Sequence, residues 1–225
     1  MPTKLSPKTL AADKSERPLE DFLKDLISQG VLAPGQRVTE AEVMRDSGAS
    51  RSRVRQAFQR LAVEGIMIIE EFRGASVKRL SKAEIIQLYE VREVLEGLAA
   101  RLAAKQASAT VKNNLARLME KMEASEESGD WALFTQINNQ WHQEITDGCQ
   151  NDYVIAMMSR LNVPLHRHLI QFFLKPDEIA MVNKDHREIT RAIIEGAAET
   201  AEKLMRRHVR SGFKLGRIRI PSDTI

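Results

Sequence analysis

The chain has 225 residues, 43% of them hydrophobic and 29% charged, which suits one large globular domain or two ordinary ones. No apolar run approaches the roughly 20 residues that cross a bilayer, and the N-terminus lacks the apolar core of a signal peptide, so we expect a cytoplasmic protein without a membrane partner. The formal net charge of +3 is too small to identify a partner, and the single cysteine, Cys149, excludes an intramolecular disulfide.

The chain begins with a polar segment and then shows helical patterns. Residues 1–17 contain two prolines and few apolar side chains, and we expect them to form a flexible arm. Apolar residues at helical spacing begin at Pro18 and are followed by the turn "APGQR". Thr39 and Glu42 have the spacing of a capping box, which predicts a short helix through about Arg45.

A tight turn and a third helix follow. Ser50 is a suitable N-cap for a helix that reaches about Glu64, and Gly65 is a typical stop signal. The segments "IMIIE" and "ASVKR" have the composition of two short strands joined at Gly74. This order of helix, helix, tight turn, helix and hairpin predicts a winged helix-turn-helix domain over residues 18–80.

The remainder of the chain has helical periodicity throughout. The expected helices cover residues 82–106, 109–126, 130–147, 151–173, 178–195 and 197–216. We therefore predict a mainly α fold, in which residues 81–217 form an antiparallel bundle of about six helices. Residues 218–225 are expected to form a C-terminal tail.

The third helix of the first domain concentrates positive charge. Residues 1–80 hold 14 Lys and Arg against 11 Asp and Glu, whereas the remaining residues are balanced at 20 each. At about 100° per residue, one face of this helix is apolar, and the others carry polar side chains. The face opposite the apolar one carries Ser52, Arg55, Gln56 and Gln59, and the flanks carry Arg51, Arg53 and Arg60.

Such a helix suits the major groove of DNA. Arginine pairs bidentately with guanine and glutamine with adenine, while arginines on the flanks bind phosphates. Arg73 and Gly74 would bring the wing tip against the duplex. The alternative is a solvated basic helix that binds nothing.

Three of the five histidines are spaced so that a helical bundle can bring them together. His142 lies one helical turn after Asn138. His186 and His208 lie at similar distances on either side of "EGAAE", so an antiparallel pair of helices would place them at one height. Three imidazoles suit Zn²⁺, Ni²⁺ or a similar divalent ion and leave coordination positions open, although each histidine could instead be an ordinary core residue.

Arg92 is a charged residue on an apolar stripe of the first long helix, one turn before Glu96. The two side chains could form an ion pair buried between helices. Alternatively, Arg92 reaches a cavity and binds the carboxylate of a small effector bidentately.

These segments resemble a known family. The string "GVLAPGQRVTEAEVMRDSGASRSRVRQAFQRLAVEGIMIIEEFRGASV" resembles the DNA-binding domain of GntR-family bacterial transcriptional regulators. The segments "LYEVREVLEGLAARLAA", "NNQWH", "DHREITRAIIEG" and "AEKLMRRHV" are similar to the FCD ligand-binding domain of the FadR branch. The resemblance implies a homodimer that binds a palindromic operator in double-stranded DNA and responds to a small effector, frequently a carboxylic acid.

The resemblance also implies which residues contact DNA. The family's DNA-contacting arginines correspond to Arg51 and Arg55, and its wing glycine to Gly74. Arg53 stands where the family usually has proline, and Gln56 where it has glutamate. Both departures make the helix more basic, so the operator sequence cannot be carried over.

The family's metal ligands correspond to His142, His186 and His208, but Asn138 stands where the family has an aspartate. A neutral amide is a weaker ligand than a carboxylate, so we expect lower affinity for a dication. An effector carboxylate could then supply the missing charge. Alternatively, the metal has been lost and the histidines bind an anion directly.

The sequence therefore predicts an effector-responsive transcriptional regulator and not an enzyme. A metal-dependent enzyme that activates water at the histidine cluster is one alternative, although no general-base motif such as HExxH accompanies the histidines. A simple nucleoid-binding protein is another, although it would not need polar residues inside the bundle.

Overall fold

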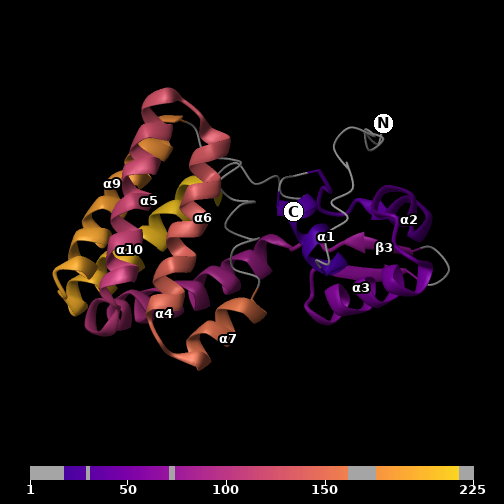
Figure 1. Cartoon of the computed structure of the whole chain (residues 1–225), viewed down its shortest axis with the longest axis horizontal. Helices are drawn as coiled ribbons and strands as arrows, with labels where there is room; N and C mark the ends of the chain where they lie inside the picture. Colours follow the sequence, from indigo (N-terminus) through magenta and orange to yellow (C-terminus); the bar gives the residue numbers. More distant parts are fainter. Residues whose placement is uncertain (1–17, 29–30, 71–73, 162–175, 218–225) are drawn as a thin grey trace. The chain divides into compact units, whose positions relative to one another are not determined.

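The computed structural model describes residues 18–28, 31–70, 74–161 and 176–217. The chain divides into two compact units, the first ending at Ser81 and the second beginning at Lys82 (Figure 1). The arm and the tail predicted from the sequence lie outside the described residues.

Helices and a small sheet make up the first unit. Its elements are α1 (Leu19–Ser28), β1 (Arg37–Val38), α2 (Glu40–Ser47), α3 (Arg51–Val63), β2 (Met67–Glu70) and β3 (Gly74–Val77). The strands pair antiparallel in the order β1-β3-β2, with Ser76 opposite both Arg37 and Ile68. The sequence predicted only the β2–β3 hairpin, because a two-residue strand is too short to show an alternating pattern.

Local side-chain contacts fix the ends of α2 and α3. The Thr39 side chain accepts a hydrogen bond from the Glu42 amide at 3.2 Å, and the Glu42 carboxylate accepts one from the Thr39 amide at 2.8 Å. The predicted capping box is therefore confirmed. Between the helices Gly48 has a φ of 69°, and the Ser50 side chain then accepts from the Arg53 amide.

The apolar face of α3 anchors that helix in the first unit. Val54, Ala57, Phe58 and Leu61 are all buried, as the helical periodicity predicts, and α3 packs against α1, α2 and β2. Burial of a large apolar side chain contributes about 1.5–3 kcal/mol. The core face therefore holds the opposite, polar face of α3 toward solvent.

Helices are the regular secondary structure of the second unit in its described residues. It contains α4 (Lys82–Gln106), α5 (Ala109–Ser128), α6 (Trp131–Gly148), α7 (Asp152–Arg160), α9 (Pro176–Ile194) and α10 (Ala198–Arg217). α4 packs against α6, α9 and α10, and α5 packs against α6 and α9. Among the described residues, none of the helices is long and apolar enough to span a membrane.

The helix predicted over residues 151–173 is shorter than expected. α7 ends at Arg160, and Leu161 is its C-cap, so the prediction of one unbroken helix is wrong at this point. Pro164 explains the end, because it has no N–H to donate to the carbonyl of Arg160. The rest of the predicted helix, from residue 162, lies outside the described residues.

Candidate functional site

The first two turns of α3 carry the predicted DNA-contacting residues. Arg51, Ser52, Arg53, Arg55 and Gln56 are all exposed. They sit where the N-terminal half of a recognition helix meets base edges and phosphates. The first unit therefore presents several hydrogen-bond donors from one rigid helix.

A glutamate on the preceding helix holds two of these arginines. Glu40, in the first turn of α2, accepts a hydrogen bond from Arg55 Nε at 2.7 Å and lies 3.5 Å from Arg51 Nε. Because both contacts use Nε, the Nη groups of each guanidinium remain available as donors to another partner. Sequence reasoning missed Glu40, since its distance from α3 depends on the turn between the helices.

The two wing residues differ in what the structure describes. Arg73 lies outside the described residues. Gly74 opens β3 with a φ of 93°, and a Cβ atom there would lie 2.6 Å from the Val38 carbonyl oxygen. Glycine is therefore required where β3 meets β1.

Three imidazoles meet inside the second unit. His142 on α6, His186 on α9 and His208 on α10 are buried, and each offers a nitrogen within 4.8 Å of the other two. Their ring centroids are 4.5 to 5.8 Å apart. We call these three residues the histidine cluster. The cluster could hold a metal ion, since neutral imidazole nitrogens are ligands for borderline dications.

Asn138 lies one turn before His142 on the buried face of α6. Its side chain is 0% exposed, and neither Oδ1 nor Nδ2 has a hydrogen-bond partner among the described residues. Leaving a buried polar group without a partner costs about 1–3 kcal/mol. A ligand or metal ion bound to the Asn138 amide oxygen would remove this cost. Asn138 and the three histidines are therefore suited to hold a metal ion.

A side-chain oxygen lies near the Nδ1 atom of each histidine of the cluster. The Nδ1 atoms of His142, His186 and His208 lie 2.8, 3.2 and 3.9 Å from side-chain oxygens of Glu96, Asn183 and Asp185, respectively. Partners of this kind orient histidine rings in metal sites. Sequence spacing indicated Glu96 only as a partner of Arg92, and it did not indicate Asn183 or Asp185. Two of the three contacts join different helices, and spacing along one chain does not reveal such contacts.

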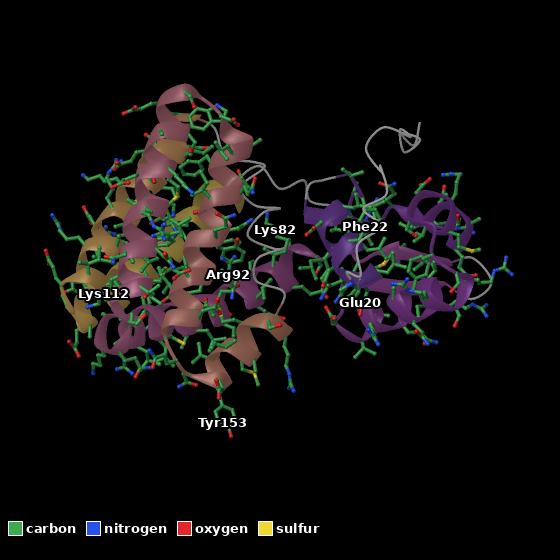
Figure 2. All side chains as sticks on the ribbon, in the orientation of Figure 1. Glu20, Phe22, Lys82, Arg92, Lys112 and Tyr153 are labelled. Atoms are coloured by element: carbon green, nitrogen blue, oxygen red, sulfur yellow. The ribbon has the colours of Figure 1, made fainter. Side chains whose placement is uncertain are left out.

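Arg92 is 2% exposed and lies within the second unit (Figure 2). Its Nε and Nη2 donate to Glu96 Oε1 at 3.0 and 2.7 Å, while Nη1 has no hydrogen-bond partner among the described residues. Burial alone would lower the pKa of Arg92, but Tyr89 and Glu96 together raise it above its ordinary value. The ion pair considered from the sequence, between Arg92 and Glu96 one turn later, is therefore confirmed, and both side chains are buried in the second unit.

Trp141 forms a wall of the histidine cluster. The indole is completely buried, with ring centroids 4.8, 4.7 and 6.3 Å from those of His142, His186 and His208. Its Nε1 donates to Thr190 Oγ1 on α9 at 2.8 Å. The cluster is therefore bounded by a rigid aromatic surface.

Comparison with known proteins gives the same division of the chain. Residues 17–77 match the family model described as "Bacterial regulatory proteins, gntR family", and residues 87–211 match the FCD domain. The second match alone covers more than half of the chain.

Curated proteins similar to this chain regulate transcription. The chain is 28% identical over 193 residues to the "Probable D-xylose utilization operon transcriptional repressor" of Paenarthrobacter nicotinovorans, covering 85% of this chain and 84% of the relative. It is 25% identical over 214 residues to the "Glc operon transcriptional activator" of Escherichia coli, with 85% and 84% covered.

Solved structures share the fold. McbR/YncC of E. coli superposes with a TM-score of 0.78 at 20% identity, covering 88% of this chain and 94% of that one. A GntR regulator from Rhodococcus sp. RHA1 gives a TM-score of 0.67 at 22% identity, with 85% and 92% covered.

Proposed function

The chain belongs to the GntR family of bacterial transcriptional regulators and carries an FCD domain, and from this premise we propose that it binds a palindromic operator as a homodimer and responds to a small carboxylic acid. Its relatives are transcriptional regulators, not enzymes, which argues against catalysis at the histidine cluster. One observation carries the proposal: an exposed arginine-bearing helix and a buried polar cluster occur in the two units of one chain.

We infer that α3 enters the major groove. Arg51 and Arg55 would pair with guanine and Gln56 with adenine, each bidentate pair contributing about 1–3 kcal/mol of discrimination. Ser52 and Arg53 would bind phosphates, and Arg73 with Gly74 would place the wing beside the duplex. The support for this assignment is the exposure of the α3 residues and the anchoring of its opposite face.

The homodimer follows from the proposed operator symmetry. Two recognition helices related by a twofold axis read two half-sites whose centres are about 34 Å, or a multiple of it, apart. Because bacterial DNA lies in the cytoplasm, we also place the protein there. Footprinting on a duplex selected from a random library would give two protected half-sites, whereas a single half-site would contradict the dimer.

For the second unit, we propose that Asn138, His142, His186 and His208 hold a divalent ion, either Zn²⁺ or Ni²⁺. The support is the convergence of three imidazole nitrogens and the lack of a hydrogen-bond partner for the Asn138 amide within the described part of the chain. Such an ion, when bound, provides a Lewis-acidic position for an effector carboxylate.

Arg92 is the second proposed contact for the effector. Because Nε and Nη2 already bind Glu96, Nη1 is the atom that would donate to an effector oxygen. This differs from the bidentate contact considered from the sequence. A single charge-assisted hydrogen bond contributes about 1.5–3 kcal/mol, enough to orient a carboxylate.

A thermal-shift screen tests the effector. Carboxylic acids and sugar acids would be added to the metal-stripped chain with and without Zn²⁺ or Ni²⁺. A ligand at 100 times its Kd stabilises the folded chain by about 2.7 kcal/mol, so binding raises the melting temperature. An acid that raises it only with metal, and changes operator affinity, supports the proposal. If no acid shifts the melting temperature under either condition, the proposed effector class is wrong.

A further inference from the structure

Glu96 joins the ion pair of α4 to the histidine cluster. Its Oε1 accepts two hydrogen bonds from Arg92, and its Oε2 lies 2.8 Å from His142 Nδ1 on α6. Arg92, Glu96 and His142 are each at most 3% exposed. A purely structural pair within α4 would not require a contact with a histidine of another helix.

The charge of the cluster shows why this contact matters. Three imidazoles that bind a metal ion are neutral, and Asn138 contributes only a neutral amide. A dication surrounded solely by neutral ligands in a buried site is electrostatically unfavourable. The proposed centre therefore needs a carboxylate nearby, and Asn138 does not supply one.

Among the residues that the structure describes, two carboxylates lie near histidines of the cluster, and they differ in burial and distance. Glu96 is 3% exposed and lies 2.8 Å from His142. Asp185 is 17% exposed, lies 3.9 Å from His208 and also binds Arg207 at 2.7 Å. Interaction energy grows as distance and local dielectric fall, so Glu96 has the stronger influence on its histidine.

We propose that Glu96 is the carboxylate of this metal centre: acting through His142, it supplies the negative charge that Asn138 lacks, and Arg92 holds it in position. This inference rests on the proposed metal site. Glu96 is a positioning residue in this arrangement, because it orients the His142 ring and raises its basicity as a ligand. Partners of metal-ligating histidines typically change metal affinity about 10- to 100-fold.

The test measures Zn²⁺ affinity of the full-length, metal-stripped chain by competition with a chromophoric chelator. Glu96→Gln should weaken binding about 10- to 100-fold. Glu93→Gln is the matched control, because Glu93 is also on α4 and pairs with Arg206 and Arg210 at 3.1 and 3.3 Å. It should bind Zn²⁺ as the native chain does, and an equal loss in both variants would overturn the inference.

A second variant separates metal affinity from folding. Glu96→Gln leaves the Arg92 charge buried without its partner, whereas Arg92→Met/Glu96→Gln removes both charges and avoids that penalty. We expect the double variant to melt cooperatively without metal and still to bind Zn²⁺ about 10- to 100-fold more weakly. Native affinity in the double variant would mean that the loss comes from unpaired Arg92, and the inference would be wrong.

Rescue and spectroscopy complete the test. Asn138→Asp in the Glu96→Gln background should restore at least about tenfold in affinity, since it returns a carboxylate to the cluster. Co²⁺ absorption bands, which report the ligand geometry, should be altered by Glu96→Gln and unaltered by Glu93→Gln. If the native chain itself takes up neither Zn²⁺ nor Co²⁺, the proposed metal site fails. Native uptake with unchanged affinity and spectrum in Glu96→Gln refutes only the role of Glu96.

Discussion

Two arginine–glutamate pairs of equal length lie in opposite environments. Arg55 and Glu40 are 2.7 Å apart, with side chains 68% and 25% exposed, whereas Arg92 and Glu96 are also 2.7 Å apart and both 3% exposed. An exposed pair contributes about 0–1 kcal/mol. Breaking a buried pair by removing one partner costs about 3–5 kcal/mol. The exposed pair can therefore separate at little cost, whereas the buried pair is a fixed part of the second unit.

The largest expected effect comes from breaking the buried pair. Arg92→Ala should lower the free energy of unfolding by about 3–5 kcal/mol, because Glu96 loses its buried partner. Arg55→Ala should change it by less than about 1 kcal/mol. Urea denaturation followed by circular dichroism measures both. Equal costs for the two substitutions would contradict the distinction between the pairs.

The next effect is on DNA affinity. Replacing both Arg51 and Arg55 with Ala should weaken binding to a selected duplex by about 100-fold or more, since each bidentate contact contributes about 1–3 kcal/mol. The melting temperature and the oligomeric state should be unchanged, because both side chains are exposed. Fluorescence anisotropy with labelled duplexes measures the affinity. Retention of sequence-specific binding would refute the role of α3.

A smaller effect is expected at Glu40. Glu40→Gln should lower the ratio of specific to non-specific affinity by about fivefold, because an exposed charged contact is worth up to about 1 kcal/mol. Its loss frees Arg51 and Arg55 to bind phosphates in other orientations. Glu64→Gln is the control: Glu64 pairs with Lys24 at 2.6 Å and is the C-cap of α3. Similar ratios in the two variants would mean that Glu40 contributes only its charge.

The smallest effect concerns Cys149, which is 0% exposed. Burial raises the pKa of its thiol above the ordinary value. The unfolded chain therefore loses this proton at lower pH than the folded chain, and stability should decline slightly as pH rises above about 8.5. Iodoacetamide labelling at pH 8 should be slow in the native chain and in Arg55→Ala, and faster in Arg92→Ala. Equally rapid labelling of all three would show that Cys149 does not report opening of the second unit.

Local rules predicted much of the fold. Thr39, Glu42 and Ser50 are within three residues of the amides they cap, so their roles follow from short-range spacing. β1 was missed because it exists only through its pairing with β3. The end of α7 was missed because the apolar periodicity continues beyond Arg160. Pro164 has no N–H that could donate to the Arg160 carbonyl, and the periodicity does not show this.

The candidate site was predicted less completely. Helical spacing and the family resemblance indicated His142, His186 and His208. Each lies on a regular helix, and the antiparallel pair formed by the last two helices brings His186 and His208 to the same level along the helix axes. The sequence did not indicate Glu40, and it indicated Glu96 only as a partner of Arg92 and not of His142. Their contacts depend on how neighbouring helices approach one another, and a single sequence does not contain that distance.

Trp141 makes the interior of the second unit optically accessible. An indole packed against three imidazoles is sensitive to any charge that arrives among them, and its emission should change when the cluster is occupied. Its hydrogen bond to Thr190 Oγ1 ties the indole to α9, which also carries His186. Trp141 fluorescence can therefore report ligand binding at the cluster. Trp131→Phe would remove the emission of the other tryptophan, so that the signal comes from Trp141 alone.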